Sequence, residues 1–506
     1  MNNYIKILLL FLYGSSFAVS QVLQNYESNF NTLFDKKEKI NPYYFGYNPA
    51  WLNKEASNEF LDLKSGVNDE SGDFKRFTDP GDIRNYSFTA TGKKRIDSNQ
   101  IFRGSFGFQR TENNNWQWLF TRDYSSGSPF LIGDSTSGNS HYNGIIMKAE
   151  YAACVYENFN LGFSINYNVD EGIKMAHPRP TSNDREINFN TGLAYHFDDN
   201  TSLGIRASVY DNVEHISYSQ DPGALTTEIV LLKFRGYDFP NVFRMASESR
   251  SSYNNGYSAG LNFSFDQPSY LTLTAFADAG FNKINIKDGG SSPVSEGFWQ
   301  NNIFHSGVVS LFKLNSSTYW SILYTFNSGD NWAKYPAFNV KYDENNWDEH
   351  SIISGFEYSV SDNMSAGLEG GVRLTNYHFN DYYSNIYSKN QVINYMLNLG
   401  LKIKWYEKLS SFVSAGITTA NVGKNDIIYA LQSSYFTDYR IKDVYFYQTG
   451  FNGYLFNIIT AYAPEFGGEI LVNLNYTNSI PGSSTQFAGQ HRSNSNIVLE
   501  YRVAAY

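Results

Sequence analysis

The stretch that decides the fold is residues 161–170, which read LGFSINYNVD. Five apolar residues, from Leu161 to Val169, alternate with five small or polar ones, from Gly162 to Asp170. Successive side chains of a β-strand point to opposite faces, so the alternation predicts a strand with one apolar and one polar face. Ten such residues exceed the usual globular strand and match the ~9–11 that a tilted strand needs to cross a bilayer.

The same alternation recurs along the chain, and the segments between the alternating stretches come in two kinds. Short turns are expected near residues 113, 158, 198–200, 267–269, 315–317, 361–363, 407–408 and 464. Longer loops rich in Asn, Ser, Gly and Tyr lie between them, for example 124–143, 170–184, 214–252 and 421–442. Short turns on one side and long loops on the other are typical of outer-membrane barrels. With a first strand near 86–96 and a last near 493–506, the pattern predicts 16–18 strands.

A bilayer explains why the alternation is so regular. Lipid offers no hydrogen-bond partners, so only helices or closed barrels cross it, and no apolar run after residue 20 approaches a transmembrane helix. The fold class expected is therefore all-β: a transmembrane antiparallel β-barrel. Aromatic residues beside short turns, such as Phe197, Tyr358 and Trp405, predict one interfacial girdle. A secreted, soluble β-sandwich, barrel or propeller is the alternative, because its strands would alternate as well.

The N-terminal part of the chain has a different texture. Residues 1–20 combine a basic residue, the apolar run ILLLFLY and the small-residue site Ala18-Val19-Ser20, which predicts a signal peptide. Residues 21–85 are polar and predict a periplasmic, plug-like segment, and residues 86–506 predict the barrel. The expected location is the outer membrane of a Gram-negative cell. Its expected partners are the membrane lipid and the barrel assembly machinery, besides a protein partner or solute that stays open.

Charged residues fall on the polar face of the predicted strands. They have two interpretations: a lining that selects solutes, or a structural ladder of ion pairs between neighbouring strands. The ladder is favoured, and Glu369 and Arg373 are expected to neutralise Lys402 and Lys404 across a hairpin. The candidate lumen charges are Arg206, Asp278, Glu357, Glu369, Arg373, Lys402, Lys404, Glu500 and Arg502.

Several kinds of chemistry are not supported by the sequence. Cys154 is the only cysteine, which excludes an intramolecular disulfide and a multi-cysteine metal site. A net charge of −10 argues against nucleic-acid binding. No metal, cofactor or catalytic constellation is predicted, and the expectation is a protein that is not an enzyme. A hydrolase at the barrel rim, using His350 or His491, is kept as a less favoured alternative.

Taken together, the predicted signal peptide, the polar N-terminal segment, the Tyr- and Asn-rich strands and the aromatic C-terminus Tyr506 resemble uncharacterised outer-membrane β-barrel proteins of Bacteroidota. Within that resemblance, Asn48-Pro49-Ala50 is similar to the N-terminal motif of the long-chain fatty-acid transporter family, which includes barrels of the type IX secretion system. The other interpretation of this motif is a helix start with Pro49 at the first helical position. The resemblance implies a channel or uptake pore for small or hydrophobic solutes. The alternative is a binding or assembly component of a secretion or surface complex.

Overall fold

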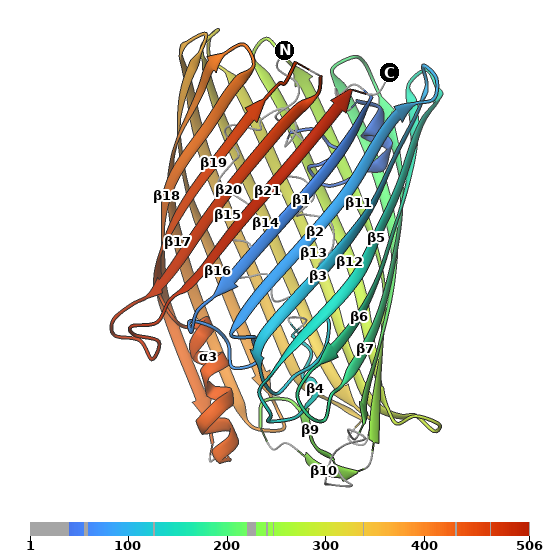
Figure 1. The fold of residues 1–506 in the computed structure, drawn as a ribbon, viewed down its shortest axis with the longest axis vertical. Coiled ribbons are helices and arrows are strands. Elements are labelled where there is room, and N and C mark those ends of the chain that lie inside the picture. The colour runs from blue at the N-terminus through green and yellow to red at the C-terminus, as the bar shows by residue number, and fades with distance from the viewer. Residues whose placement is uncertain are drawn as a thin grey trace.

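The chain forms one closed barrel, which stands upright in Figure 1. The computed structural model describes residues 40–54, 59–124, 127–219, 229–238, 241–245, 247–336, 339–430, 433–465 and 467–504. The expected signal peptide and Tyr506 lie outside these residues. None of the helices in the described ranges is long and apolar enough to span a membrane.

The barrel wall consists of 18 antiparallel strands, which confirms the predicted fold class and strand number. Each strand pairs with the next wall strand along the chain. Closure comes from β1 and β21, which pair over twelve residues from Phe60↔Ala504 to Ser71↔Ser493. The wall strands are β1 (Phe60–Ser71), β2 (Asp82–Arg95), β3 (Gln100–Trp116), β5 (Gly138–Tyr156), β6 (Phe159–Lys174), β7 (Thr181–His196), β8 (Thr201–Ser219), β11 (Ser247–Gln267), β12 (Leu271–Asp288), β13 (Val294–Lys313), β14 (Thr318–Tyr335), β15 (Val340–Ser361), β16 (Met364–Asp381), β17 (Ile386–Tyr406), β18 (Leu409–Tyr429), β19 (Phe451–Tyr462), β20 (Glu469–Pro481) and β21 (Arg492–Ala504).

The side chains are distributed inside out compared with a soluble protein. Leu399 is 58% exposed on the outer wall, whereas its neighbour Asn398 is 3% exposed and faces the lumen. Leu499 and Glu500 repeat the contrast at 53% and 0%. Buried polar residues and exposed apolar residues on adjacent positions follow when the outside solvent is hydrocarbon. The barrel is therefore a transmembrane one.

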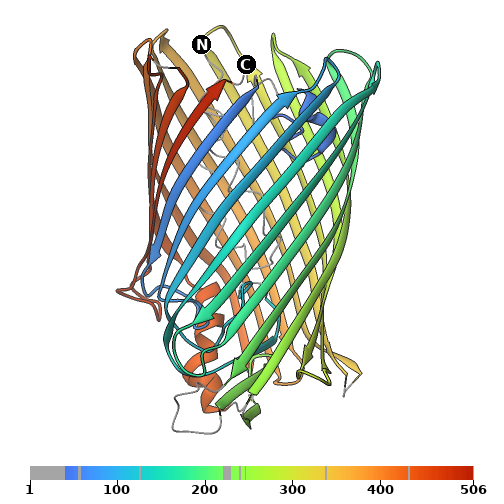
Figure 2. The ribbon, with the colours of Figure 1, turned by 45° about the vertical axis from the view of Figure 1, so that its right-hand side comes forward.

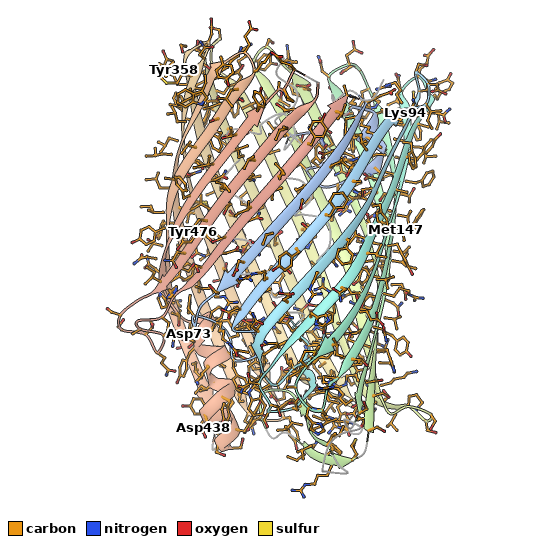
Figure 3. All side chains as sticks on the ribbon, in the orientation of Figure 1. Asp73, Lys94, Met147, Tyr358, Asp438 and Tyr476 are labelled. Atoms are coloured by element: carbon orange, nitrogen blue, oxygen red, sulfur yellow. The ribbon has the colours of Figure 1, made fainter. Side chains whose placement is uncertain are left out.

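The outer wall also shows the expected aromatic girdle. Tyr358 and Trp405 are 49% and 60% exposed beside short turns, and Figure 3 places Tyr358 at the top of the barrel. Met147 and Tyr476 lie at mid-height in the same view, at 40% and 43% exposure. We call the end with the girdle the short-turn end and the opposite one the long-loop end.

Two details of the sequence interpretation are wrong near the N-terminus. The wall begins with β1 at Phe60, so the boundary expected at residue 86 is too late. The turn expected near Asn113 is instead at 96–99, and Asn113 pairs with Ser140 inside the wall. Charged residues on the lumen side of β1, such as Asp62, hide its apolar alternation. One strand was missed and one was split by a false turn, so the total of eighteen still holds.

Most segments expected to be long loops are continuations of strands. The stretch 170–184 is a tall hairpin, since β6 runs to Lys174 and β7 begins at Thr181. A second sheet lies at the long-loop end, with β9 (Ile229–Arg235) between β10 (Asn241–Met245) and β4 (Phe130–Gly133). Figure 2 shows it near α3 (Ile441–Tyr447), which follows a short π-helix, η3 (Phe436–Arg440).

Candidate functional site

The lumen contains a folded N-terminal segment, residues 40–54, near the short-turn end. It ends in a 3₁₀-helix, η2 (Pro49–Lys54), so Pro49 is indeed the first helical residue. The same motif is also buried against the wall. The Asn48 side chain donates to the carbonyl oxygen of Ile205 at 3.1 Å and to Oδ1 of Asn262 at 3.3 Å. Its own Oδ1 accepts from the Ala50 backbone N–H at 3.0 Å.

Glycines in the wall make room for this segment. A Cβ on Gly192 would collide with the Asn48 side chain, and one on Gly204 would collide with the ring of Trp51. Gly162 lies equally close to the backbone of Pro49 and Ala50. The wall and the segment are therefore fitted to each other.

A carboxylate of the wall anchors the other half of the segment. Tyr43 and Tyr47 donate their hydroxyls to Oε1 of Glu150 at 2.5 and 2.9 Å, and Lys148 lies 2.8 Å from the same atom. Burial, and then the charge of Glu150, raises the pKa of both tyrosines well above the usual range. Both phenols therefore stay protonated and remain hydrogen-bond donors.

A cluster of aromatic rings lies at the long-loop end, and we call it the aromatic cap: Phe77, Trp118, Phe234, Tyr435 and Tyr439. The Trp118 ring lies 5.1 Å from Phe77, 5.5 Å from Tyr435 and 5.2 Å from Tyr439. Phe234 stacks on Tyr435 at 5.0 Å. Aromatic pairs at these separations attract beyond their burial, by about 0.5–1.5 kcal/mol each.

The aromatic cap joins opposite sides of the mouth. Phe234 belongs to the segment between β8 and β11, whereas Tyr435 belongs to the segment between β18 and β19. Eight strands separate these two places around the wall in one direction and ten in the other. The stacked pair therefore links two segments that leave the wall on opposite sides, and the link is made by their rings.

Charged groups lie next to the aromatic cap and hydrogen-bond to its backbone. Arg440 and Asp443 are both buried and lie 2.6 Å apart, and Asp443 also accepts the Phe77 backbone N–H at 2.6 Å. Burial raises the pKa of Asp443 in spite of the nearby Arg440. Burial acts in the same sense on Asp79, but the charge of Arg76, 2.6 Å away, outweighs it and lowers the Asp79 pKa.

Among the predicted lumen charges, Arg206 and Asp278 form a direct pair. Arg206 Nε donates to Asp278 Oδ1 at 2.6 Å, although β8 and β12 are separated by β11. The residue between them is Gly260, which is paired with Arg206 on one side and Asp278 on the other. A Cβ on Gly260 would collide with the Asp278 carboxylate. The glycine therefore lets two side chains meet across an intervening strand.

Glu500 and Arg502 form a second buried group with a wall residue that the sequence interpretation had not chosen. Arg502 lies 2.7 Å from Glu500 and 3.4 Å from Asp62 on β1. The three side chains are 0–2% exposed. This group joins the first and last strands, where the barrel closes.

The expected pairing of Glu369 and Arg373 with Lys402 and Lys404 is wrong. Register places Glu369 opposite Asn398 and Arg373 opposite Asn394, while Lys402 lies opposite Ser365. Both lysines lie at the short-turn end of β17, and Arg373 instead approaches Glu349 at 3.8 Å. Order along a hairpin does not give the pairing, because the register decides which side chains face each other.

Glu357, the remaining predicted lumen charge, lies on the lumen side of β15 and is half-buried near the short-turn end. Two histidines were the candidates for a rim hydrolase, His350 and His491. His350 is on the outer face of β15, where its Nδ1 is 3.0 Å from the Tyr324 hydroxyl, while Ser351 faces the lumen. His491 contributes its backbone carbonyl, which accepts from the Phe74 N–H at 3.1 Å.

A group of lumen carboxylates was missed because 170–184 was interpreted as a loop. Asp170 is paired with Asp184, and Asp184 is paired with Glu214, so three carboxylates stand side by side on β6, β7 and β8. All three are buried, and we call them the acidic row. Within the described ranges, no three His, Cys, Asp or Glu side chains are arranged to hold a metal ion.

Comparison with solved structures finds other membrane barrels. The ferric-catecholate import receptor Fiu of E. coli K12 is 8% identical, with 88% of this chain and 82% of that chain covered and a TM-score of 0.41. The alcaligin outer-membrane receptor FauA of Bordetella pertussis is 9% identical, with 88% and 76% covered and a TM-score of 0.41. A FadL homologue of Pseudomonas aeruginosa is 11% identical, with 91% and 93% covered and a TM-score of 0.35. At these values the likeness assigns no solute, and the fold rests on the strand pairing of the chain itself.

No curated protein matches the chain. A family model does: the one described as a family of unknown function, DUF6850, matches residues 49–502. That match runs from Pro49 in the lumen segment through all 18 wall strands to Arg502 in β21. The chain therefore belongs to the DUF6850 family.

Proposed function

We propose that the protein is a gated channel of the Gram-negative outer membrane that admits small solutes. The short-turn end would face the periplasm, as short turns do in barrels of this kind, and the aromatic cap would face outward. The N-terminal segment would then be the inner closure. The observation that carries the proposal is that neither closure belongs to the strand pairing of the wall: the N-terminal segment lies inside the lumen, and the aromatic cap joins its segments through ring contacts.

The free-energy cost of opening differs between the wall and its closures, so the closures can move while the wall stays folded. Strand pairing around the full barrel must be broken as a unit, whereas the contacts of a loop open locally at a much lower free-energy cost. The lumen side of the wall carries polar side chains such as Asn394 and Asn398, which water can solvate when the cap opens. A polar lining behind a cap that can open suits the passage of hydrophilic solutes. A lumen that stayed closed would more simply be filled with apolar side chains.

Conductance of the purified protein in a planar bilayer tests this proposal. The double substitution Trp118→Ala and Tyr435→Ala removes the rings shared by most pairs of the aromatic cap. We expect the open probability to rise about tenfold or more, because about 2–4 kcal/mol of ring contacts holds the cap closed. Tyr270→Ala is the matched control, since Tyr270 is 50% exposed at the opposite end.

Deletion of residues 21–54 provides a second arm and leaves β1 intact. If the N-terminal segment is the inner closure, the deletion combined with the cap substitutions should give the largest conductance. A protein that inserts as a barrel and stays silent as the cap variant, as the deletion and as their combination would contradict a channel.

A further inference from the structure

We propose that the acidic row is a binding site for an organic cation, an amine or guanidinium compound, inside the lumen. The row consists of Asp170, Asp184 and Glu214, and Glu186 lies two residues along β7 on the same face as Asp184. The inference deepens the proposed function, because a solute would reach the row through the lumen.

The strand register places the carboxylates of the row next to one another, and their repulsion destabilises the barrel unless a cation compensates it. Directly opposed residues on neighbouring antiparallel strands have their Cβ atoms about 4.5–5.5 Å apart, and like charges in such pairs repel. Asp184 has a carboxylate on each side, and it is 6% exposed. The other ionic groups of the lumen described above each combine carboxylates with an arginine or lysine of the wall. The acidic row gathers three carboxylates without a basic residue from its own strands.

The donors already present satisfy the two ends of the row better than its middle. Glu214 accepts hydrogen bonds from Thr121, Ser182 and the Arg122 backbone N–H. At the other end, Asp170 accepts from Arg122 Nε at 3.1 Å.

In the middle, Asp184 accepts from the neutral Asn212 amide at 2.8 Å. Glu186 accepts from Asn168 Nδ2 at a long 3.4 Å. The space between Asp184 and Glu186 is therefore the place for a cation.

A second observation points to a ligand with N–H groups. Asn168 lies directly opposite Glu186, is 8% exposed, and its Oδ1 has no hydrogen-bond partner. A buried amide oxygen without a donor is costly, by about 1–3 kcal/mol, so such atoms are usually satisfied. An ammonium or guanidinium group bound beside Glu186 and Asp184 would bring N–H donors next to this amide.

The spacing of the row does not let one metal ion bind all three of its carboxylates. Neighbouring strands lie about 4.7–4.9 Å apart, so three carboxylates on three strands extend over roughly 10 Å. A calcium or magnesium ion needs its oxygen ligands at about 2.0–2.6 Å. An elongated molecule with several amino groups matches carboxylates spread over that length.

Arg122 indicates how such a ligand would bind. It is a guanidinium that comes from the segment between β3 and β5, four residues from Trp118 of the aromatic cap, and it already lies against Asp170. Because this guanidinium already compensates Asp170 and would repel a second cation there, a cationic solute would bind at Asp184 and Glu186.

Isothermal titration of the detergent-purified full chain with spermidine, at low ionic strength and in slightly alkaline buffer, tests the site. We expect saturable binding that is weakened about ten- to hundredfold in the double variant Asp184→Asn and Glu186→Gln. Glu465→Gln is the matched control: it removes the same charge from a residue at a short turn whose side chain is 87% exposed. The single variant Asp184→Asn is included in case the double variant does not fold, and it should lose part of the affinity.

Equal binding by the wild type and the folded Asp184→Asn protein, or no binding by either, would overturn the site. If a proton shared by the carboxylates of the row takes the place of a cation, neither protein binds spermidine. The outcomes for the site and for the channel are separate. Spermidine binding in a protein that never conducts contradicts the channel alone. Conductance in a protein that neither binds spermidine nor prefers cations in a salt gradient contradicts the site alone.

Discussion

The substitution Leu399→Arg is expected to lower the free energy of unfolding from a bilayer by about 2–4 kcal/mol. Leu399 is 58% exposed, so in a soluble protein an arginine there would cost little. In the barrel this side chain lies in the middle of β17 among other outward-facing leucines, and the guanidinium would have to enter hydrocarbon. Folding into lipid vesicles, followed by intrinsic fluorescence and by heat-modifiable gel mobility across a urea series, measures the change.

Leu314→Arg is the control that isolates depth in the membrane. Leu314 has the same side chain and nearly the same exposure, 57%, but lies in the turn between β13 and β14. Its substitution should cost about 0–1 kcal/mol. Equal effects at the two positions would mean that the outer wall faces one uniform solvent.

The second large effect is expected for Gly260→Ala, in the lumen. The added methyl group collides with the carboxylate of Asp278, which must then leave Arg206. Breaking a buried ion pair and leaving a charge without its partner costs about 3–5 kcal/mol. We expect the urea midpoint to fall by a corresponding amount, with the barrel still able to insert at low urea.

Gly92→Ala distinguishes this collision from a general effect of replacing glycine in a strand. Gly92 lies in β2, and a Cβ there would meet no atom within 4 Å. Alanine should be tolerated or slightly stabilising at that position, because glycine weakens strands through its entropy. If both variants lose the same stability, the Arg206–Gly260–Asp278 arrangement does not matter for folding.

The barrel itself could be predicted because its pattern is local. In 161–170, every second residue is apolar, and the strand that results has the predicted sides facing lipid and lumen. The pattern is weakest in β1, where Asp62 and Lys64 face the lumen and leave only Leu61, Leu63 and Val67 to mark the outer face.

The site was harder to predict because it depends on register between strands and on packing between distant segments. The position of Asn48 in the lumen rests on contacts with residues about 150 to 210 positions away, which no local pattern records. The acidic row had a usable signal, because Asp170 continues the polar parity of 161–170. Interpreting the tall hairpin as a loop concealed it. The aromatic cap gave no signal beyond a richness in Tyr, Phe and Trp.

The most direct test of the account is a nitroxide scan of β17 in lipid vesicles, made in a Cys154→Ala background because Cys154 is the single native cysteine. Labels placed one at a time from residue 394 to residue 401 report collisions with dissolved oxygen, which concentrates in hydrocarbon. We expect high oxygen accessibility at 395, 397, 399 and 401 and low accessibility at the even positions between them. Even positions that are the more accessible, or a scan without a period of two, would contradict it.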